Sequence, residues 1–376
     1  MLPVLGFVAA ATASASTDPG RFTWKTATPA ESGLREAPLE ALAERIRNDP
    51  EINIHSVLVV RHGKLVFEEY FRGTDEAWGE DLGQVQFTRN TLHDLRSVTK
   101  SVTSAVVGIA IAEGRIPDVD TSAFELFPAY ADHLAPNKAR LTLHHILTMS
   151  AGLDWFEPPD YANPGNDEIR MISSPDPVAF TLGRSFRTPP GEAFEYNGGL
   201  PTLLGYLLEE AYGRRGDELF SQKLFLPLGI SEYEFHANAN GLLAYASGLR
   251  LTPRAMAKLG LLYLEKGVWM GRQLLPEAWI TSSLTPHLPS SWTPGYGYQW
   301  WIMKFTGEVG DVWVPAAIGN GHQRIFILEP QGMVVVVTAG HYNEARVKFD
   351  GIDMLIEHVF PAAGLNDMRF VPLDRH

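Results

Sequence analysis

The sequence predicts an α+β fold in which both ends of the chain build one antiparallel sheet flanked by helices. Two observations predict it. Apolar segments typical of strands lie near both termini, whereas residues 115–235 contain short helices and loops without a convincing strand. We therefore expect a sheet lobe from residues 20–114 and 236–376, a helical lobe inserted at 115–235, and a cleft between them. A length of 376 residues is sufficient for this arrangement.

The first elements follow from their periodicity. Residues 37–48 are expected to form a helix whose buried stripe is Leu39, Leu42, Ala43 and Ile46. Residues 56–60 and 65–71, joined by the turn 61–64, predict a β-hairpin. A helix from about Ser97 to Gly114 follows, with a broad apolar stripe of Val98, Val102, Ala105, Val106, Ile109 and Ala110.

The middle and the end of the chain differ in character. The clearer central helices are 141–149 and 201–212, and the loop 154–167 between them is rich in proline and acidic residues. A loop of this length inside a compact domain is usually functional or disordered. Near the C-terminus the pattern predicts three strands and one helix, at 296–305, 323–328, 333–338 and 346–358.

The composition excludes several classes of function. The net charge is −13 and no basic run is present, which argues against nucleic acid or an anionic membrane surface as a partner. The chain has no cysteine, so disulfides, thiolate zinc sites and thiol nucleophiles are excluded. No apolar run is long enough to span a bilayer. No feature of the sequence indicates the oligomeric state.

Residues 1–16 are small and apolar and end in Ala13-Ser14-Ala15-Ser16, which is typical of a secretory signal with its cleavage site. The positive segment that normally precedes such a signal is missing, since the first basic residue is Arg21. We expect a periplasmic or secreted protein. The competing interpretation is a disordered tail on a cytoplasmic protein.

The most informative segment contains the single Ser-x-x-Lys pattern of the chain, Ser97 and Lys100. Residues three apart share a helix face, so a hydroxyl lies beside an amine, as a nucleophile lies beside a base. Ser97 falls at the helix start, where unpaired N–H groups and the helix dipole favour a developing negative charge. Alone, the pattern also fits an ordinary helix start with a solvent-facing lysine.

Two further segments favour the interpretation of Ser97 and Lys100 as a nucleophile and its base. Tyr196-Asn197-Gly198 forms a turn just before the helix at 201, from which a phenol can project into a cleft. Gly319-Asn320-Gly321-His322 runs into the strand at 323, where backbone N–H groups lie open to a ligand because glycine has no Cβ. Each segment alone also fits an ordinary turn.

In this order, the three signals resemble the serine β-lactamase and penicillin-binding superfamily. The resemblance is greatest to its serine-hydrolase branch, which includes class C β-lactamases, family VIII carboxylesterases and 6-aminohexanoate-dimer hydrolases. It extends over about residues 30–360 and includes the segments 95–101, 145–153, 295–301 and 319–325. The resemblance implies the β-lactamase/transpeptidase-like fold and acyl transfer without a metal or another cofactor.

The resemblance also implies roles for the site residues. Ser97 Oγ would attack an ester or amide carbonyl, and either Lys100 or Tyr196 would take its proton. The N–H groups of Ser97 and His322 would form the oxyanion hole, so the substrate is expected beside Asn197, Gly319, Asn320 and Gly321. Water would then hydrolyse the acyl-enzyme.

Two positions depart from the pattern. Many relatives have asparagine as the third residue of the tyrosine motif, where this chain has Gly198, so Asn197 is a weak substitute for that amide. Gly319 stands where β-lactamases place a lysine that recognises the carboxylate of the β-lactam. We therefore expect a serine hydrolase for esters or small amides. The alternatives are a β-lactamase or D,D-peptidase, and a catalytically weak protein of the same fold that binds peptides or cell-wall fragments.

The acidic loop supplies the expected substrate wall, which consists of Trp155, Phe156 and Tyr161. Its carboxylates are interpreted as solvated rather than as metal ligands, namely Asp154, Asp160, Asp167 and Glu168. The chain has neither the Gly-x-Ser-x-Gly motif of α/β-hydrolases nor the His-Glu-x-x-His motif of zinc proteases.

Overall fold

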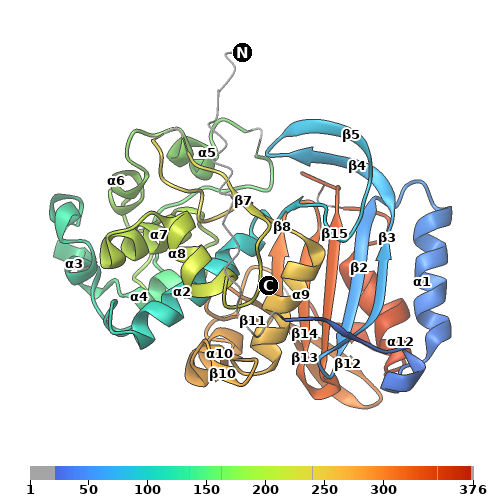
Figure 1. The fold of residues 1–376 in the computed structure, drawn as a ribbon. Coiled ribbons are helices and arrows are strands. Elements are labelled where there is room, and N and C mark those ends of the chain that lie inside the picture. Colours follow the sequence, from blue (N-terminus) through green and yellow to red (C-terminus); the bar gives the residue numbers. More distant parts are fainter. Residues whose placement is uncertain (1–21, 135, 162, 239, 345, 374–376) are drawn as a thin grey trace.

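The computed structural model describes residues 22–134, 136–161, 163–238, 240–344 and 346–373 (Figure 1). The signal-like segment 1–16 lies outside the described residues. The centre of the fold is a nine-stranded sheet, antiparallel except for its β1–β3 pair. Its strands in spatial order are β1 (Lys25–Thr26), β3 (Lys64–Tyr70), β2 (Ile54–Arg61), β15 (Met333–Ala339), β14 (Gln323–Leu328), β13 (Gly310–Gly319), β12 (Trp301–Gly307) and β11 (Gly295–Tyr296), and β16 (Arg369–Phe370) also pairs with β12. Both chain ends thus build the sheet, and the expected α+β fold is confirmed.

Side chains of the central strands alternate between two apolar cores. In β2, Leu58 and Val60 face one core, whereas Val57 and Val59 face the other. The helices α2 (Val98–Ala112) and α9 (Pro253–Leu264) cover the first face of the sheet, and α1 (Glu36–Asn48), α11 (Gly351–Met354) and α12 (Phe360–Ala362) cover the second. Burial on both faces explains why these strands are almost continuously apolar.

Helices form the other side of the molecule (Figure 1). They are α3 (Ala123–Leu126), α4 (Leu143–Leu147), α5 (Asp167–Ile172), α6 (Pro177–Leu182), α7 (Gly199–Tyr212) and α8 (Gly216–Phe220). Since α2 packs against both α7 and the strands β13 and β14, it connects these helices to the sheet. The start of α2, where Ser97 lies, is therefore held from two sides.

Smaller elements complete the chain. They are the hairpin of β4 (Arg72–Ala77) and β5 (Glu80–Gln86), the three-stranded sheet of β6 (His93–Asp94), β8 (Leu249–Leu251) and β7 (Tyr233–Phe235), the pair β9 (Val268–Trp269) and β10 (Arg272–Gln273), and helix α10 (Glu277–Leu284). Within the described residues, no helix combines the length and apolar character needed to cross a membrane.

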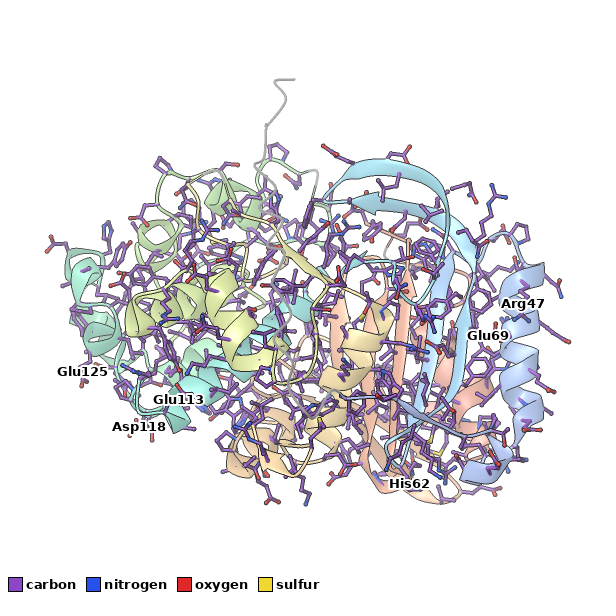
Figure 2. All side chains as sticks on the ribbon, viewed as in Figure 1. Arg47, His62, Glu69, Glu113, Asp118 and Glu125 are labelled. Carbon is purple, nitrogen blue, oxygen red and sulfur yellow. The ribbon has the colours of Figure 1, made fainter. Side chains whose placement is uncertain are left out.

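The charged side chains labelled in Figure 2 lie on the outside of these layers. Arg47 of α1 and Glu69 of β3, both labelled in Figure 2, form an ion pair at 2.5 Å. An exposed pair of this kind contributes about 0–1 kcal/mol, so the two apolar cores rather than surface charges hold the layers together.

Several sequence expectations need correction. The strand expected at 296–305 is two strands, β11 and β12, separated by a turn in which Gln299 has a φ of 66°. In that turn Gly297 lies so close to the Ser283 carbonyl that a Cβ would be 1.9 Å from its oxygen, so only glycine fits there. The strand β13 and the hairpin β4–β5 were not predicted.

The helix expected at 346–358 begins only at Gly351, because the Asp350 carboxylate caps it by accepting from the N–H groups of Ile352 and Asp353. The helices expected at 141–149 and 201–212 occupy 143–147 and 199–212. A short strand, β7, also lies inside the segment where no strand was expected.

Candidate active site

Ser97 and Lys100 lie one helical turn apart, as the sequence predicts. Ser97 is the N-cap of α2, and Arg96 before it has a left-handed φ of 48°, so the chain turns sharply into the helix. Lys100 is only 1 % exposed. Its Nζ donates to Ser97 Oγ at 3.1 Å and to the Ala246 carbonyl at 3.0 Å. The amine is therefore held against the hydroxyl and shielded from water.

The structure brings Tyr196 to the same point. Tyr196 lines the same cleft as Ser97, and its ring centroid is 5.0 Å from Lys100 Nζ. The ring stacks on Trp301 with centroids 5.6 Å apart, which fixes its orientation. Burial and the nearby Glu157 raise the pKa of Tyr196 well above its ordinary value. The phenol is thus protonated in the resting protein, which favours Lys100 over a Tyr196 phenolate as the base.

A cleft of about 1090 Å³ opens in front of these groups. Ser97 and Tyr196 line it together with the four residues of the predicted glycine turn, Gly319, Asn320, Gly321 and His322. Phe194 and Trp301 also line the cleft, and so do residues that were given no role from the sequence, among them Glu157, Trp292, Arg324, Asn343 and Glu344. The nucleophile is therefore open to a substrate, and aromatic rings form much of the surrounding surface.

The glycine turn is positioned by close packing. A Cβ on Gly319 would lie 2.1 Å from the Leu95 carbonyl oxygen, so only glycine lets β13 approach the segment before Ser97. Gly321 and His322 have left-handed φ values of 84° and 68°. Asn320 fixes the turn by exchanging two 2.8 Å hydrogen bonds with Asn343. This geometry fixes the backbone of the turn at the wall of the cleft that Ser97 also lines.

A cation does lie beside the position where β-lactamases carry lysine. Arg324 lines the cleft, and its guanidinium donates to the carbonyls of Gly319 and Gln323 at 3.0 and 2.9 Å. It also contacts His322 Nδ1 at 3.3 Å. Burial and Arg324 lower the pKa of His322 to about 4, so this imidazole is neutral near pH 7. Because the Arg324 guanidinium already donates to backbone carbonyls, it has fewer N–H groups left for a substrate carboxylate than a free lysine ammonium would have.

Asn197 does not replace the missing amide. Its side-chain oxygen accepts from the Gly199 N–H at 2.8 Å, and the residue is buried at the start of α7. It therefore caps a helix turn. At Gly198, an added Cβ would lie 2.8 Å from the Glu168 carboxyl carbon, so that carboxyl group occupies the space next to this glycine.

The expected substrate wall is placed differently from the sequence interpretation. Of its three residues, Tyr161 lines the cleft, whereas Trp155 is buried behind it and Phe156 points to solvent with 52 % exposure. Trp155 donates through Nε1 to Glu157 at 2.7 Å, and the Tyr161 hydroxyl donates to the same carboxyl at 3.1 Å. The loop therefore presents Glu157 to the cleft, a residue that sequence reasoning missed.

The loop acids were expected to be solvated, and two of them are not. Asp167 is 2 % exposed and is paired with Arg170 and Arg184. Glu168 is 5 % exposed, and its Oε1 accepts from the Ser247 hydroxyl at 3.4 Å. Their burial could not be recognised from the sequence, because the loop composition is that of a solvated segment.

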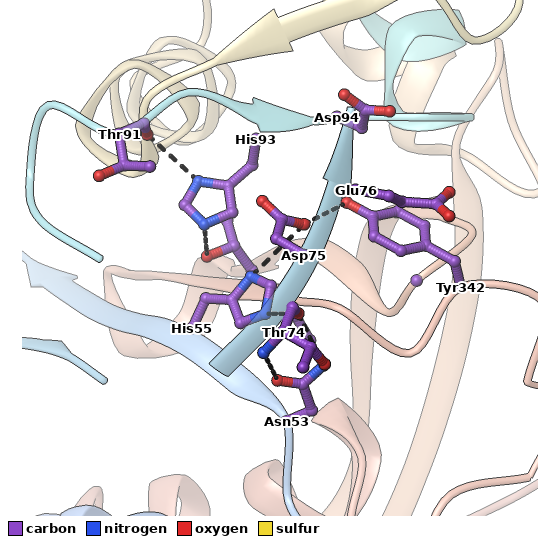
Figure 3. Close-up of polar contacts among 12 residues, drawn as sticks. Asn53, His55, Thr74, Asp75, Glu76, Thr91, His93, Asp94 and Tyr342 are labelled. Carbon is purple, nitrogen blue, oxygen red and sulfur yellow. Dashed lines mark hydrogen bonds and ion pairs between the residues drawn. The ribbon is translucent and has the colours of Figure 1, made fainter. Parts of the chain in front are cut away.

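One group of described side chains offers three potential metal ligands outside the cleft (Figure 3). The ligand atoms of His55, Asp75 and His93 lie within 4.8 Å of one another. His55 Nδ1 is 4.0 Å from Asp75 Oδ1, however, while ligands of a tetrahedral zinc with bonds of 2.0–2.1 Å are roughly 3.3 Å apart. The His93 nitrogens also already face the Thr91 carbonyl and the Thr338 hydroxyl. As placed, the three side chains do not form a tetrahedral site.

The same group supports the active site. The Tyr342 hydroxyl donates to Asp75 at 3.0 Å, as Figure 3 shows. The Tyr342 ring in turn packs beside Gly321, where a Cβ would lie 2.6 Å from the ring. The buried polar group thus lies behind the glycine turn and holds one of its neighbours.

An α+β fold in which Ser97 and Tyr196 line one cleft, with the buried Lys100 hydrogen-bonded to Ser97, defines a member of the serine β-lactamase and penicillin-binding superfamily. More specifically, the chain belongs to the Beta-lactamase family, whose model matches residues 42–354.

Known relatives agree with this assignment. The 6-aminohexanoate-dimer hydrolase of Paenarthrobacter ureafaciens is 27 % identical over 336 residues, covering 83 % of this chain and 79 % of the relative. A family VIII carboxylesterase structure aligns with a TM-score of 0.65 and 14 % identity, covering 91 % and 99 % of the two chains. The octameric penicillin-binding protein homologue from Pyrococcus abyssi aligns with a TM-score of 0.63 and 18 % identity, covering 87 % and 75 %. The structural likenesses show the fold, and the family indicates a hydrolase.

Proposed function

We propose that the protein hydrolyses esters or small amides through an acyl-enzyme on Ser97. The observation that carries this proposal is the 3.1 Å contact between Lys100 Nζ and Ser97 Oγ at the wall of an open cleft. A nucleophile and a base within hydrogen-bond distance, held rigidly by a buried helix, are the arrangement that nucleophilic catalysis requires.

In the proposed acylation, Ser97 Oγ bonds to the substrate carbonyl carbon while Lys100, in its neutral form, takes the hydroxyl proton. The protonated Tyr196 phenol then gives its proton to the leaving alcohol or amine, and Lys100 restores it. Water attacks the acyl-enzyme by the same route in reverse and returns a proton to Ser97. Acid–base assistance of this kind contributes about 10²–10⁴ in rate.

The negative charge on the substrate oxygen is assigned to backbone donors. Among the described residues, the Ser97 N–H has no backbone acceptor. The His322 N–H in the glycine turn is the second donor in the proposal. Each oxyanion donor is worth about 3 kcal/mol in comparable acyl-transfer sites, so rigid packing of the turn against Leu95 contributes directly to the rate.

The cleft favours substrates without the carboxylate of a β-lactam. Position 319 cannot carry a lysine, because any Cβ there meets the Leu95 carbonyl. The guanidinium of Arg324 is engaged with backbone carbonyls instead. The aromatic side chains of Phe194, Trp292 and Trp301 suit an apolar acyl or alcohol group.

A second candidate function is binding without efficient turnover, of peptides or cell-wall fragments. The observation that favours it is the altered tyrosine motif, in which Asn197 caps a helix instead of reaching the site. Hydrolysis of p-nitrophenyl butyrate well above background by the wild type, and its loss in Ser97→Ala, would eliminate this candidate.

A substrate panel tests the proposed function. Initial rates are compared for p-nitrophenyl acetate and butyrate, 6-aminohexanoate dimer and nitrocefin, with Ser97→Ala as the blank. We expect ester cleavage to exceed nitrocefin cleavage. A faster rate with nitrocefin would show that Arg324 supplies the carboxylate recognition that position 319 lacks.

A further inference from the structure

Aromatic rings that contact one another run along the catalytic cleft, beginning at Tyr196. The Tyr196 ring stacks on Trp301 with centroids 5.6 Å apart, and Trp301 contacts Trp292 with centroids 5.2 Å apart. All three rings, here called the aromatic row, line the cleft. Lys100 Nζ lies 3.1 Å from Ser97 Oγ and 5.0 Å from the Tyr196 centroid, so the aromatic row begins beside the nucleophile. In the order of these contacts, Trp292 is the ring at the far end.

The turn before β11 fixes Trp292 at that end. Ser290 Oγ accepts from the N–H groups of Trp292 and Thr293 at 3.2 and 2.8 Å, and Ser290 is buried. The Trp292 side chain also packs against both apolar cores. Its ring is therefore held in place before a ligand binds, so binding does not have to order it.

Residues 369–373, here called the tail segment, complete this end of the cleft. Their strand β16 pairs with β12, the strand that begins at Trp301. The Phe370 ring contacts the Trp292 ring with centroids 5.9 Å apart, and the Leu373 N–H donates to the Trp292 carbonyl at 3.1 Å. Leu373 is half-buried and lines the cleft. The tail segment thus brings an apolar side chain to the far end of the aromatic row.

The chemistry of this end of the cleft favours an apolar ligand. Trp301, Trp292 and Leu373 carry no charge. The charged side chains that line the cleft come from other segments of the chain, namely Glu157, Glu195, Arg324 and Glu344. Moving a hydrocarbon chain from water onto an apolar surface is favourable in proportion to the area that it buries. The far end of the aromatic row therefore suits a hydrocarbon chain better than a charged group.

We propose that Trp292 and Leu373 form the far end of an apolar subsite for one unbranched chain of the substrate, and that Leu373 limits the length of that chain. An extended chain advances about 3.5 Å for every three bonds, so the 5.6 and 5.2 Å steps of the aromatic row match at most about nine bonds. We therefore expect a chain of about eight carbons to fill the subsite. This inference rests on the proposed function and specifies its substrate class.

The experiment measures kcat/KM against chain length in two series. One series varies the acyl chain in p-nitrophenyl esters from acetate to dodecanoate, and the other varies the alcohol in acetate esters of straight-chain alcohols. In the series whose chain occupies the subsite, wild-type kcat/KM should rise about two- to fourfold per methylene up to about eight carbons and then fall. The series that responds identifies the chain as acyl or alcohol.

Substitutions at Leu373 should move this optimum in opposite directions. Leu373→Trp fills the end of the subsite and should shift the optimum to chains at least about two carbons shorter. Leu373→Ala opens the end and should shift it to chains at least about two carbons longer. Leu226→Trp is the matched control, because Leu226 is an exposed leucine after α8 and should leave the optimum unchanged.

An optimum that stays at the wild-type length in both Leu373 variants, in both series, would overturn the proposal. Thermal unfolding confirms that each variant folds. If Leu373→Trp does not fold, an unchanged optimum in Leu373→Ala is sufficient to overturn it.

Binding measurements separate this proposal from the proposed function. Calorimetry with Ser97→Ala, which requires no turnover, should show octanamide binding at least about tenfold more tightly than acetamide. Adding Leu373→Trp to Ser97→Ala should reduce this preference at least about threefold, and an equal preference in both proteins would overturn the subsite. Wild-type turnover in Ser97→Ala would instead refute the proposed function.

Discussion

Replacing Gly319 by alanine places a methyl group against the backbone that precedes the nucleophile. Because the new Cβ would lie 2.1 Å from the Leu95 oxygen and ordinary contact begins near 3.4 Å, the end of β13 must retreat by about 1.3 Å. The turn that carries the His322 N–H moves with it. A misplacement of about 1 Å can cost 10²-fold in rate, and loss of one oxyanion donor costs about 10²–10³. We expect kcat/KM to fall by about 10²-fold.

The assay is steady-state hydrolysis of p-nitrophenyl butyrate, with thermal unfolding measured in parallel to confirm that the variant folds. Gly165→Ala is the matched control, because its Cβ would meet only the Asn163 side chain at 3.2 Å and the Phe156 ring at 3.9 Å. The control should keep wild-type activity. Wild-type kcat/KM in folded Gly319→Ala would refute the placement of the oxyanion hole at this turn.

Four other substitutions probe the acid–base residues, one buried histidine and the core. Lys100→Ala and Tyr196→Phe should each lose at least about 10²-fold in kcat while folding normally, and full activity in Tyr196→Phe would leave Lys100 as the sole acid–base group. His93 has a pKa lowered by burial to about 3, so the unfolded chain binds its proton first as the pH falls below 6.5. We therefore measure the free energy of unfolding in urea at a series of pH values. Between pH 6 and 4 it should fall in the wild type by up to about 1.4 kcal/mol per pH unit more than in His93→Gln. Parallel pH curves for the two proteins would contradict this. Leu58→Ala, at a fully buried position of β2, should lower the free energy of unfolding by about 2–5 kcal/mol, and a change below 1 kcal/mol would show that the site collapses around the cavity.

Local patterns were sufficient to predict much of the sheet. The hairpin of β2 and β3 was predictable because apolar runs and a Gly63 turn lie within one short segment. The strand β13 was missed because it contains Pro315, which lacks the N–H of a regular ladder but still pairs opposite Ile302. Such a strand is stabilised by its neighbours rather than by its own sequence.

The candidate site likewise has a part that local sequence predicts and a part that only the tertiary fold creates. Ser97 and Lys100 could be paired from the sequence because one helical turn fixes their spacing. Glu157 and Glu168 could not be placed beside Gly198, because they come from a loop and a short helix that only the tertiary fold brings there. Trp155 was expected to form part of the substrate wall, but it is buried and donates to Glu157 instead of lining the cleft.

The most direct test of the central claim is intact mass after incubation with a fluorophosphonate, followed by peptide mapping of the modified residue. We predict one covalent adduct on wild type, located on Ser97, with no adduct in Ser97→Ala. Unmodified wild-type protein, or equal modification of Ser97→Ala, would contradict the assignment of Ser97 as the nucleophile.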